Sequence, residues 1–266
     1  MSVYLELTEC FNERRLRAVI SSGQAVVLHR LAVMSKDGDW ILREDQETMT
    51  HVLTVLARFQ AHYRFGAPLD VRWMAGGWSA HLEFRRDDLR VRTDFVTRPP
   101  RLAPVELQHL LLEQENRRIP FVNPRHLADL KKTNREKDYA VIGELARLMT
   151  DPRDQLMYSR SARDLTVLAG QHPDLVSRLT KERPLLAKIS LGREVIEQAL
   201  DAERRVLMRK NEERLALYLD AAQGWSQRWP EVSREIEGRP LLEAHQVLVR
   251  RADGCLPFAL PEAPRG

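Results

Sequence analysis

The sequence predicts an α/β fold, a small mixed sheet with flanking helices, followed by an all-helical C-terminal region. Up to about residue 150, short apolar runs with period-two alternation interleave with stretches of helical periodicity. Beyond residue 150 this alternation is rare, and apolar residues recur at helical spacing instead. We therefore expect two domains, an α/β domain over residues 1–150 and a helical domain over residues 151–266.

Composition narrows the class of protein. The 266 residues are 43% hydrophobic and 30% charged, which suits a folded chain with a sizeable core and well-solvated helices. Two cysteines, Cys10 and Cys255, supply neither a disulfide framework nor a cysteine-based zinc site. The chain starts without a signal-peptide pattern, and no apolar stretch approaches the ~20 residues of a membrane span. We expect a cytoplasmic protein with no membrane partner, and its net charge of +4 suits a polyanionic ligand.

The first half contains the predicted sheet. Each strand or helix follows from apolar periodicity and from the turn residues that bound the run. The expected strands are 18–20, 39–42, 69–74, 81–85 and 89–97, and the expected helices are 24–31 and 44–63. The polar residues 86–88 join the last two strands as a hairpin, and Pro99-Pro100 ends it because proline cannot donate to a ladder.

Helices dominate from residue 104 onward. Asn123 and Pro124 form a typical helix start, with asparagine as N-cap and proline at the first helical position. A short strand, 119–122, is expected just before them. The expected helices are 104–115, 124–131, 134–149, 161–170, 173–182, 190–223, 226–237 and 239–251.

A pair of aspartates follows the first predicted helix. Ser22 and Gly23 allow a tight turn before that helix, where backbone N–H groups can approach a phosphate. Asp37 and Asp39 stand two residues apart in the segment that begins at Ser35, so an extended chain points both carboxylates to one side. Two convergent carboxylates are typical ligands of a Mg²⁺ ion that also binds nucleotide phosphates.

A third carboxylate lies in the last predicted strand. By alternation Asp94 shares a face with Arg90 and Arg92, whereas Val91 and Phe95 take the other face. Strands disfavour aspartate, so Asp94 requires a partner such as a metal cation or an arginine. Near the first two carboxylates it would complete a site for one or two divalent ions in phosphoryl chemistry.

A basic segment precedes an apolar helix in the region 127–138. Lys131, Lys132, Arg135 and Lys137 place four positive charges within seven residues. Beside a helix start such charges can reach triphosphate oxygens, although a solvated basic turn is the alternative interpretation. Other chemistries lack their motifs, since the chain has neither a nucleotide-binding glycine loop nor a zinc-spaced histidine pair. A structural role is the interpretation for His81.

In combination these features resemble the DNA polymerase β-like nucleotidyltransferase superfamily, and within it the minimal and AbiEii-type toxin–antitoxin branch. That family has a glycine-rich turn, a short helix and a [Ser/Thr]-x-Asp-x-Asp strand, which Ser22-Gly23 and the segment from Ser35 to Asp39 resemble. A later strand supplies its third carboxylate, here Asp94. The segment 123–138 is similar to the family's helical pair with lysine and aspartate. The resemblance covers roughly residues 15–150.

Two departures from the family pattern stand out. The family's turn has two glycines or Gly-Ser, whereas a serine precedes Gly23 here, and Val33 stands where an arginine is common. A second register stays open, in which Gly76-Gly77 forms the turn and Asp94 begins the carboxylate strand. Its turn matches better, but Val96 occupies the place of the second aspartate. Asp94 is a site residue in both registers.

The resemblance implies a metal-dependent nucleotidyltransferase that moves a nucleotidyl group from an NTP to an RNA, such as tRNA, or to a protein. Asp37 and Asp39 would ligate Mg²⁺, while Asp94 would ligate a second ion and help to activate the acceptor hydroxyl. The expected nucleotide-binding residues are Ser22, Gly23, Ser35, Lys131, Arg135 and Lys137. A cognate toxin or antitoxin partner is also implied.

Two other interpretations stay open. The altered turn is compatible with a catalytically inactive, nucleotidyltransferase-like module that binds a nucleotide or a partner protein in a regulatory role. Alternatively, the chain is a structural partner in which the helix over 190–223 mediates dimerisation. The sequence leaves the NTP preference, the acceptor and the oligomeric state undetermined.

Overall fold

The computed structural model describes residues 2–261 and confirms the predicted fold class. A five-stranded mixed sheet with flanking helices is followed by a helical C-terminal region. Contacts divide the chain into two compact units: unit 1 comprises Met1–Val122 and Leu215–Gly266, and unit 2 comprises Asn123–Arg214. The predicted domain boundary at residue 150 falls inside unit 2, and a domain division at that point stays a prediction.

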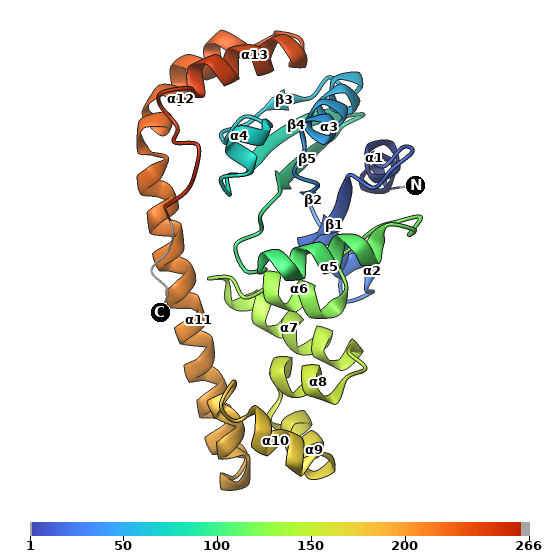
Figure 1. Cartoon of the computed structure of the whole chain (residues 1–266), viewed down its shortest axis with the longest axis vertical. Coiled ribbons are helices and arrows are strands. Elements are labelled where there is room, and N and C mark those ends of the chain that lie inside the picture. Colours follow the sequence, from blue (N-terminus) through green and yellow to red (C-terminus); the bar gives the residue numbers. More distant parts are fainter. Residues whose placement is uncertain (1, 262–266) are drawn as a thin grey trace. The chain divides into compact units, whose positions relative to one another are not determined.

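The sheet belongs to unit 1 and has the strand order β1-β2-β5-β4-β3 (Figure 1). Its strands are β1 Ala18–Ser21, β2 Asp37–Leu42, β3 His62–Tyr63, β4 Ala80–Arg86 and β5 Leu89–Val96. Only β2 and β5 run parallel among these pairs; the other neighbours are antiparallel. The predicted hairpin is confirmed, because β4 and β5 pair as antiparallel strands. Arg86 faces Leu89 next to the turn, and the pairing continues to Ala80 opposite Phe95.

Aromatic packing explains why helices cover one face of this sheet. Trp40 on β2 stacks on its cross-strand partner Phe95 on β5, with ring centroids 5.5 Å apart. Phe11, at the end of the first helix, meets Trp40 edge-on at 5.3 Å. Such rings bury large apolar areas and dominate core energetics. The helices of unit 1 are α1 Val3–Phe11, α2 Ser22–Leu28, α3 Gln46–Arg58, α4 Val71–Met74, α5 Pro104–Gln114, α12 Gln223–Ile236 and α13 Leu241–Ala252.

Three predicted elements of unit 1 were wrong in type or length. The expected strand 69–74 is the short helix α4, because the Asp70 side chain accepts a hydrogen bond from the Arg72 N–H and caps it. The expected helix 44–63 ends at Arg58, and strand β3 follows it. The expected strand 119–122 makes only an isolated bridge between Phe121 and Ile20.

The end of the chain returns to the sheet unit. The indole N–H groups of Trp73 and Trp78 donate to the carbonyl oxygens of Leu256 and Pro257, at 3.1 and 2.8 Å. The N–H of Leu260 donates to the carbonyl oxygen of Gly76 at 2.9 Å. Segments from the first and the last part of the sequence therefore form one compact unit.

Unit 2 is helical. Asn123 caps its first helix as predicted, by accepting a hydrogen bond from the His126 N–H. Leu156, Leu165 and Ile196 are fully buried in its core. Across residues 2–261, no helix combines the length and apolarity that a bilayer crossing requires. The helices of unit 2 are α6 Pro124–Leu130, α7 Glu136–Leu148, α8 Pro152–Tyr158, α9 Ala162–Gln171, α10 Pro173–Leu179, the 3-10 helix η1 Pro184–Leu191 and most of α11 Arg193–Ala221.

Candidate active site

The face of the sheet opposite the aromatic layer carries a line of polar side chains. Asp39 on β2 is the register partner of Asp94 on the parallel strand β5. Asp94 is in turn the register partner of His81 on β4. Just after β3, Arg64 donates its backbone N–H to the carbonyl oxygen of His81 at 2.9 Å. We call Asp39, Asp94, His81 and Arg64 the aspartate row, which crosses adjacent strands about 4.8 Å apart.

A second polar line lies two residues further along each strand. Asp37 pairs in register with Arg92, Arg92 with Glu83, and Glu83 with His62. Strand side chains repeat every two residues, so this line shares a face with the aspartate row. Burial alone would raise the pKa of Glu83, but hydrogen bonds and charge from Arg90, followed by His62, lower it below its usual range. The second line thus contains a firmly ionised carboxylate.

Asp94 is engaged on one of its two oxygens. Its Oδ1 accepts hydrogen bonds from the Arg64 guanidinium and from Nδ1 of His81, the latter at 2.8 Å. The Asp94 side chain is 25% exposed, so solvent or a ligand can reach it. Its Oδ2 carries neither of these two bonds.

Asp37 contributes an unsatisfied oxygen. Its Oδ1 is buried and has no hydrogen-bond partner within the described part of the chain, since the nearest cationic atom, Nη1 of Arg92, lies 3.6 Å away. A buried carboxylate oxygen without a partner is costly and rare. Burial and then the negative charges of Asp37 and Asp39 raise the pKa of Tyr4, which indicates negative potential at this edge.

The predicted turn packs against the start of the carboxylate strand. A Cβ at Gly23 would collide with the Ser35 side chain, so this close approach requires glycine. The Gln24 side chain donates to the carbonyl oxygens of Ser35 and Asp37, at 3.1 and 3.3 Å. Ser22 has a φ of 49°, in the left-handed region that favours glycine. The structure therefore brings the turn and β2 together, with a serine where glycine would be relaxed.

The second register lacks the short helix that follows the glycine turn in the family pattern. Gly76 and Gly77 lead directly into strand β4 rather than into a helix. A Cβ at Gly76 would collide with the backbone of Phe258, so this glycine accommodates the returning end of the chain. Gly77 has a φ of 89°, in the left-handed region that favours glycine, so packing and backbone conformation explain the pair.

Magnesium suits the donor chemistry of this face, although no ligand cage is preformed. Within residues 2–261, no group of three or more His, Cys, Asp and Glu side chains is gathered to hold a metal ion. Mg²⁺ usually takes only one or two protein carboxylates and completes its shell with water and substrate phosphates. Asp37, whose Oδ1 accepts no hydrogen bond within the described residues, and Asp39 are carboxylates of this kind.

The basic residues predicted to bind nucleotide lie in unit 2, whereas the aspartates lie in unit 1. Lys131 is buried, and its Nζ lies 3.2 Å from Oδ1 of Asp138. Arg135 bonds Oδ2 of the same carboxylate at 2.8 Å. Burial alone would raise the pKa of Asp138, but a hydrogen bond from Thr133 and the charges of Lys131 and Arg135 lower it. Arg135 and Lys137 are both exposed, whereas Lys131 is buried.

Two members of the aspartate row are not among the predicted site residues. A structural role is the sequence-based interpretation for His81, and its imidazole bonds Asp94. Counting outward from the hairpin turn, where Arg86 faces Leu89, places His81 opposite Asp94, so the sequence held this signal. For Arg64 the sequence gives no such signal, because β3 is only two residues long and the helical pattern continues to residue 63.

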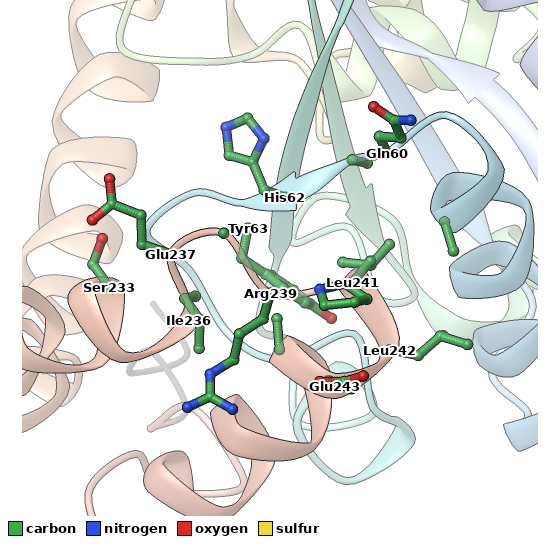
Figure 2. Close-up of a pocket in the computed structure, with 15 residues that line it drawn as sticks. Gln60, His62, Tyr63, Ser233, Ile236, Glu237, Arg239, Leu241, Leu242 and Glu243 are labelled. Atoms are coloured by element: carbon green, nitrogen blue, oxygen red, sulfur yellow. The ribbon is translucent and has the colours of Figure 1, made fainter.

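A hollow of about 940 Å³ in unit 1 is distinct from the aspartates (Figure 2). Its lining comes from the end of α3, from β3 and from the α12–α13 region, and it does not include Asp37, Asp39 or Asp94. Figure 2 shows His62 and Tyr63 leaving β3 in opposite directions. The hydroxyl of Tyr63 lies 2.8 Å from Nδ1 of His245 on α13.

Comparison with known proteins gives distant structural matches. No family model matches the chain, and no curated protein matches it. A crystal structure of a candidate nucleotidyltransferase from H. pylori matches with 14% identity and a TM-score of 0.38, covering 79% of this chain and 94% of its own. The crystal structure of JHP933 from Helicobacter pylori matches with 15% identity and a TM-score of 0.39, covering 82% and 95%. Because the sequence identities and the TM-scores are low, the functional interpretation depends on the residues of the site.

Proposed function

We propose that the chain is a metal-dependent nucleotidyltransferase whose centre lies on the polar face of the sheet. The observation that carries the proposal is the register of β2 and β5, which makes Asp39 and Asp94 neighbours and sets Asp37 two residues away on the same face. The buried Oδ1 of Asp37, which has no hydrogen-bond partner among the described residues, adds to the case for a cation.

Each aspartate has a distinct task in this proposal. Asp37 and Asp39 bind the metal that carries the triphosphate, and Asp94 offers Oδ2 to a second ion or to the acceptor hydroxyl. Arg64 and His81 orient the Asp94 carboxylate through Oδ1. Bound Mg²⁺ would neutralise the phosphate charge that develops during transfer.

Phosphate contacts come from two groups of residues in the proposal. The tight turn of Ser22 and Gly23 against Ser35 brings backbone close to the carboxylate strand. The second group, Lys131, Arg135 and Lys137, comes from the family resemblance alone; it lies in unit 2, where Arg135 and Lys137 are exposed and Lys131 is buried. The acceptor class, RNA or protein, and a toxin–antitoxin partner follow from the family resemblance of the sequence.

The proposal is tested by incubating pure protein with each labelled NTP, Mg²⁺, total RNA and a protein mixture. Transfer should occur with the parent and with the Asp88→Asn control, whose carboxylate is exposed in the hairpin turn. It should be lost in the double variant Asp37→Asn/Asp39→Asn, which keeps the side-chain shapes. Equal transfer by the double variant would overturn the assignment.

A regulatory, catalytically inactive module is the second candidate. The contacts of Arg64 and His81 to Asp94 favour it, because they already compensate one carboxylate without a metal. It predicts nucleotide binding whose Kd does not change when Mg²⁺ is added, and no transfer to any acceptor. Calorimetric titration with and without Mg²⁺ separates the two candidates.

A further inference from the structure

A serine completes a hydrogen-bonded chain with the aspartate row. Oγ of Ser79 lies 2.9 Å from Nε2 of His81, and Nδ1 of His81 lies 2.8 Å from Oδ1 of Asp94. Nucleophile, base and orienting carboxylate thus stand in the order known from activated serines. Ser79 immediately precedes β4, two residues before His81, so both side chains lie on the polar face.

The hydrogen-bond roles in this chain depend on the tautomer of His81. A carboxylate accepts, so Nδ1 of His81 donates to Asp94. In the tautomer that carries its proton on Nδ1 alone, Nε2 is an acceptor and the hydroxyl of Ser79 donates to it. The geometry therefore aims the serine proton at a base, which is the arrangement that activates a hydroxyl.

The surrounding packing holds this chain in place. Gly66 lies against the imidazole, because a Cβ there would come within 2.6 Å of Cδ2 of His81. The carbonyl oxygen of Ser79 accepts a hydrogen bond from the Ala67 N–H at 3.0 Å. Ser79 and His81 are both half-buried, so they are ordered yet open to a ligand.

We propose that Ser79 is a built-in acceptor and that the chain transfers a nucleotidyl group to its own Ser79 hydroxyl. The inference rests on the proposed function, since Asp94 orients His81 and also neighbours Asp39 across β5 and β2. In the proposal the phosphorus electrophile is bound at the aspartates, and one of them, Asp94, is the register partner of His81.

Transfer to Ser79 forms one bond to the α-phosphorus of the NTP and breaks another. Oγ of Ser79 attacks the α-phosphorus of the NTP and forms a new oxygen–phosphorus bond. The bond from the α-phosphorus to the oxygen that bridges to the β-phosphorus breaks, and pyrophosphate leaves with the electron pair. The serine proton moves to Nε2 of His81, and the resulting imidazolium faces Asp94. The product is a serine phosphodiester that carries the nucleoside.

The test uses the full chain with each NTP and Mg²⁺, in parallel samples with and without added RNA. Intact mass followed by peptide mapping locates any nucleotidyl group on the parent without relying on a variant. Ser79→Ala should lose the adduct, whereas the control Ser226→Ala, an exposed serine on α12, should keep it. His81→Gln should slow modification of Ser79 by about 100-fold or more.

The outcomes separate this inference from the proposed function. An adduct on Ser79 that is lost in Ser79→Ala and slowed in His81→Gln supports the inference. Transfer to RNA or to another side chain with Ser79 unmodified overturns the inference and leaves the proposed function standing. Absence of transfer to every acceptor overturns both. An adduct that forms at the parental rate in His81→Gln overturns the role of His81 as the base.

Discussion

Asp94 in unit 1 and Asp138 in unit 2 each face two basic side chains, but their surroundings differ. Asp138 uses both oxygens, with Lys131 on Oδ1 and Thr133 and Arg135 on Oδ2, and its side chain is 4% exposed. Asp94 takes both of its contacts on Oδ1 and is 25% exposed. A carboxylate satisfied on both sides stabilises a fold, whereas one engaged on a single side can still bind a ligand.

The same contrast holds for the neighbours of each aspartate. In unit 2, the carboxylate of Glu203 accepts hydrogen bonds from Arg183 and Arg160, whose side chains are nearly buried. In unit 1, Asp37 keeps a buried oxygen with no hydrogen-bond partner among the described residues. We infer that the buried ion pairs of unit 2 around Asp138 and Glu203 act mainly on stability, while the carboxylates of the sheet face act mainly on chemistry.

The largest expected effect is on catalysis in unit 1. Asp39→Asn should lower nucleotidyl transfer about 1000-fold, equivalent to ~4 kcal/mol, because the amide cannot replace a charged metal ligand. The thermal unfolding midpoint should stay close to that of the parent. Rate and unfolding measurements on the same preparation check both parts, and a large drop in stability would remove the contrast between the units.

The second largest expected effect is a loss of stability caused by a change in unit 2. Asp138→Asn leaves the buried Lys131 without its anionic partner and should lower the free energy of unfolding by about 3 kcal/mol. Denaturant titration measures this change. Asp174→Asn, at an exposed position on α10, is the matched control and should leave stability within about 0.5 kcal/mol. A loss of transfer without any loss of stability would instead assign Asp138 and Lys131 to nucleotide binding.

A third prediction concerns a buried histidine of unit 1. Burial lowers the pKa of His245 below its usual 6.5, and the nearby positive charge of Arg72 lowers it further, against the opposing effect of Asp70. The unfolded chain then binds a proton that the folded chain refuses, so stability is full above pH 6.5 and falls as the pH drops toward the folded pKa. Each pKa unit by which folding lowers the value contributes about 1.4 kcal/mol to the free energy of unfolding. Urea titrations at several pH values should show this slope in the parent and a flatter one in His245→Gln.

The smallest effect concerns backbone strain beside the carboxylates. Ser22→Gly should raise the free energy of unfolding by up to about 1 kcal/mol, because glycine adopts the φ of 49° without steric cost. Ser21→Gly is the matched control, since Ser21 has an extended φ of −129° and should lose stability. If both variants lose stability, the turn is held by the Ser22 side chain rather than strained by it.

Local signals in the sequence were sufficient for much of the fold. The hairpin of β4 and β5 and the cap at Asn123 follow from alternation and turn chemistry, and the structure confirms both. The strand predicted over 69–74 fails because its apolar run is short, and such runs do not separate strand from helix by periodicity. There Asp70 decides in favour of a helix through a side-chain cap.

The candidate site was only partly predictable, for a related reason. Alternation placed Asp37 and Asp39 on one face, and the parallel pairing of β2 with β5 sets them beside Asp94. That pairing is long-range, so no local pattern specifies it. The contact from Arg64 depends on the edge strand β3, which the sequence did not reveal because a helix was predicted there.

The returning end of the chain has a consequence for biogenesis. Trp73 and Trp78 receive their carbonyl partners from Leu256 and Pro257, which the ribosome makes long after the two indoles. All of residues 79–255 must be synthesised first, which takes roughly 9 to 35 s at ordinary translation speeds. During that interval two indoles of the nascent sheet unit lack their final cover. Premature termination would therefore release a polypeptide with aromatic surface exposed, a natural substrate for chaperones and proteases.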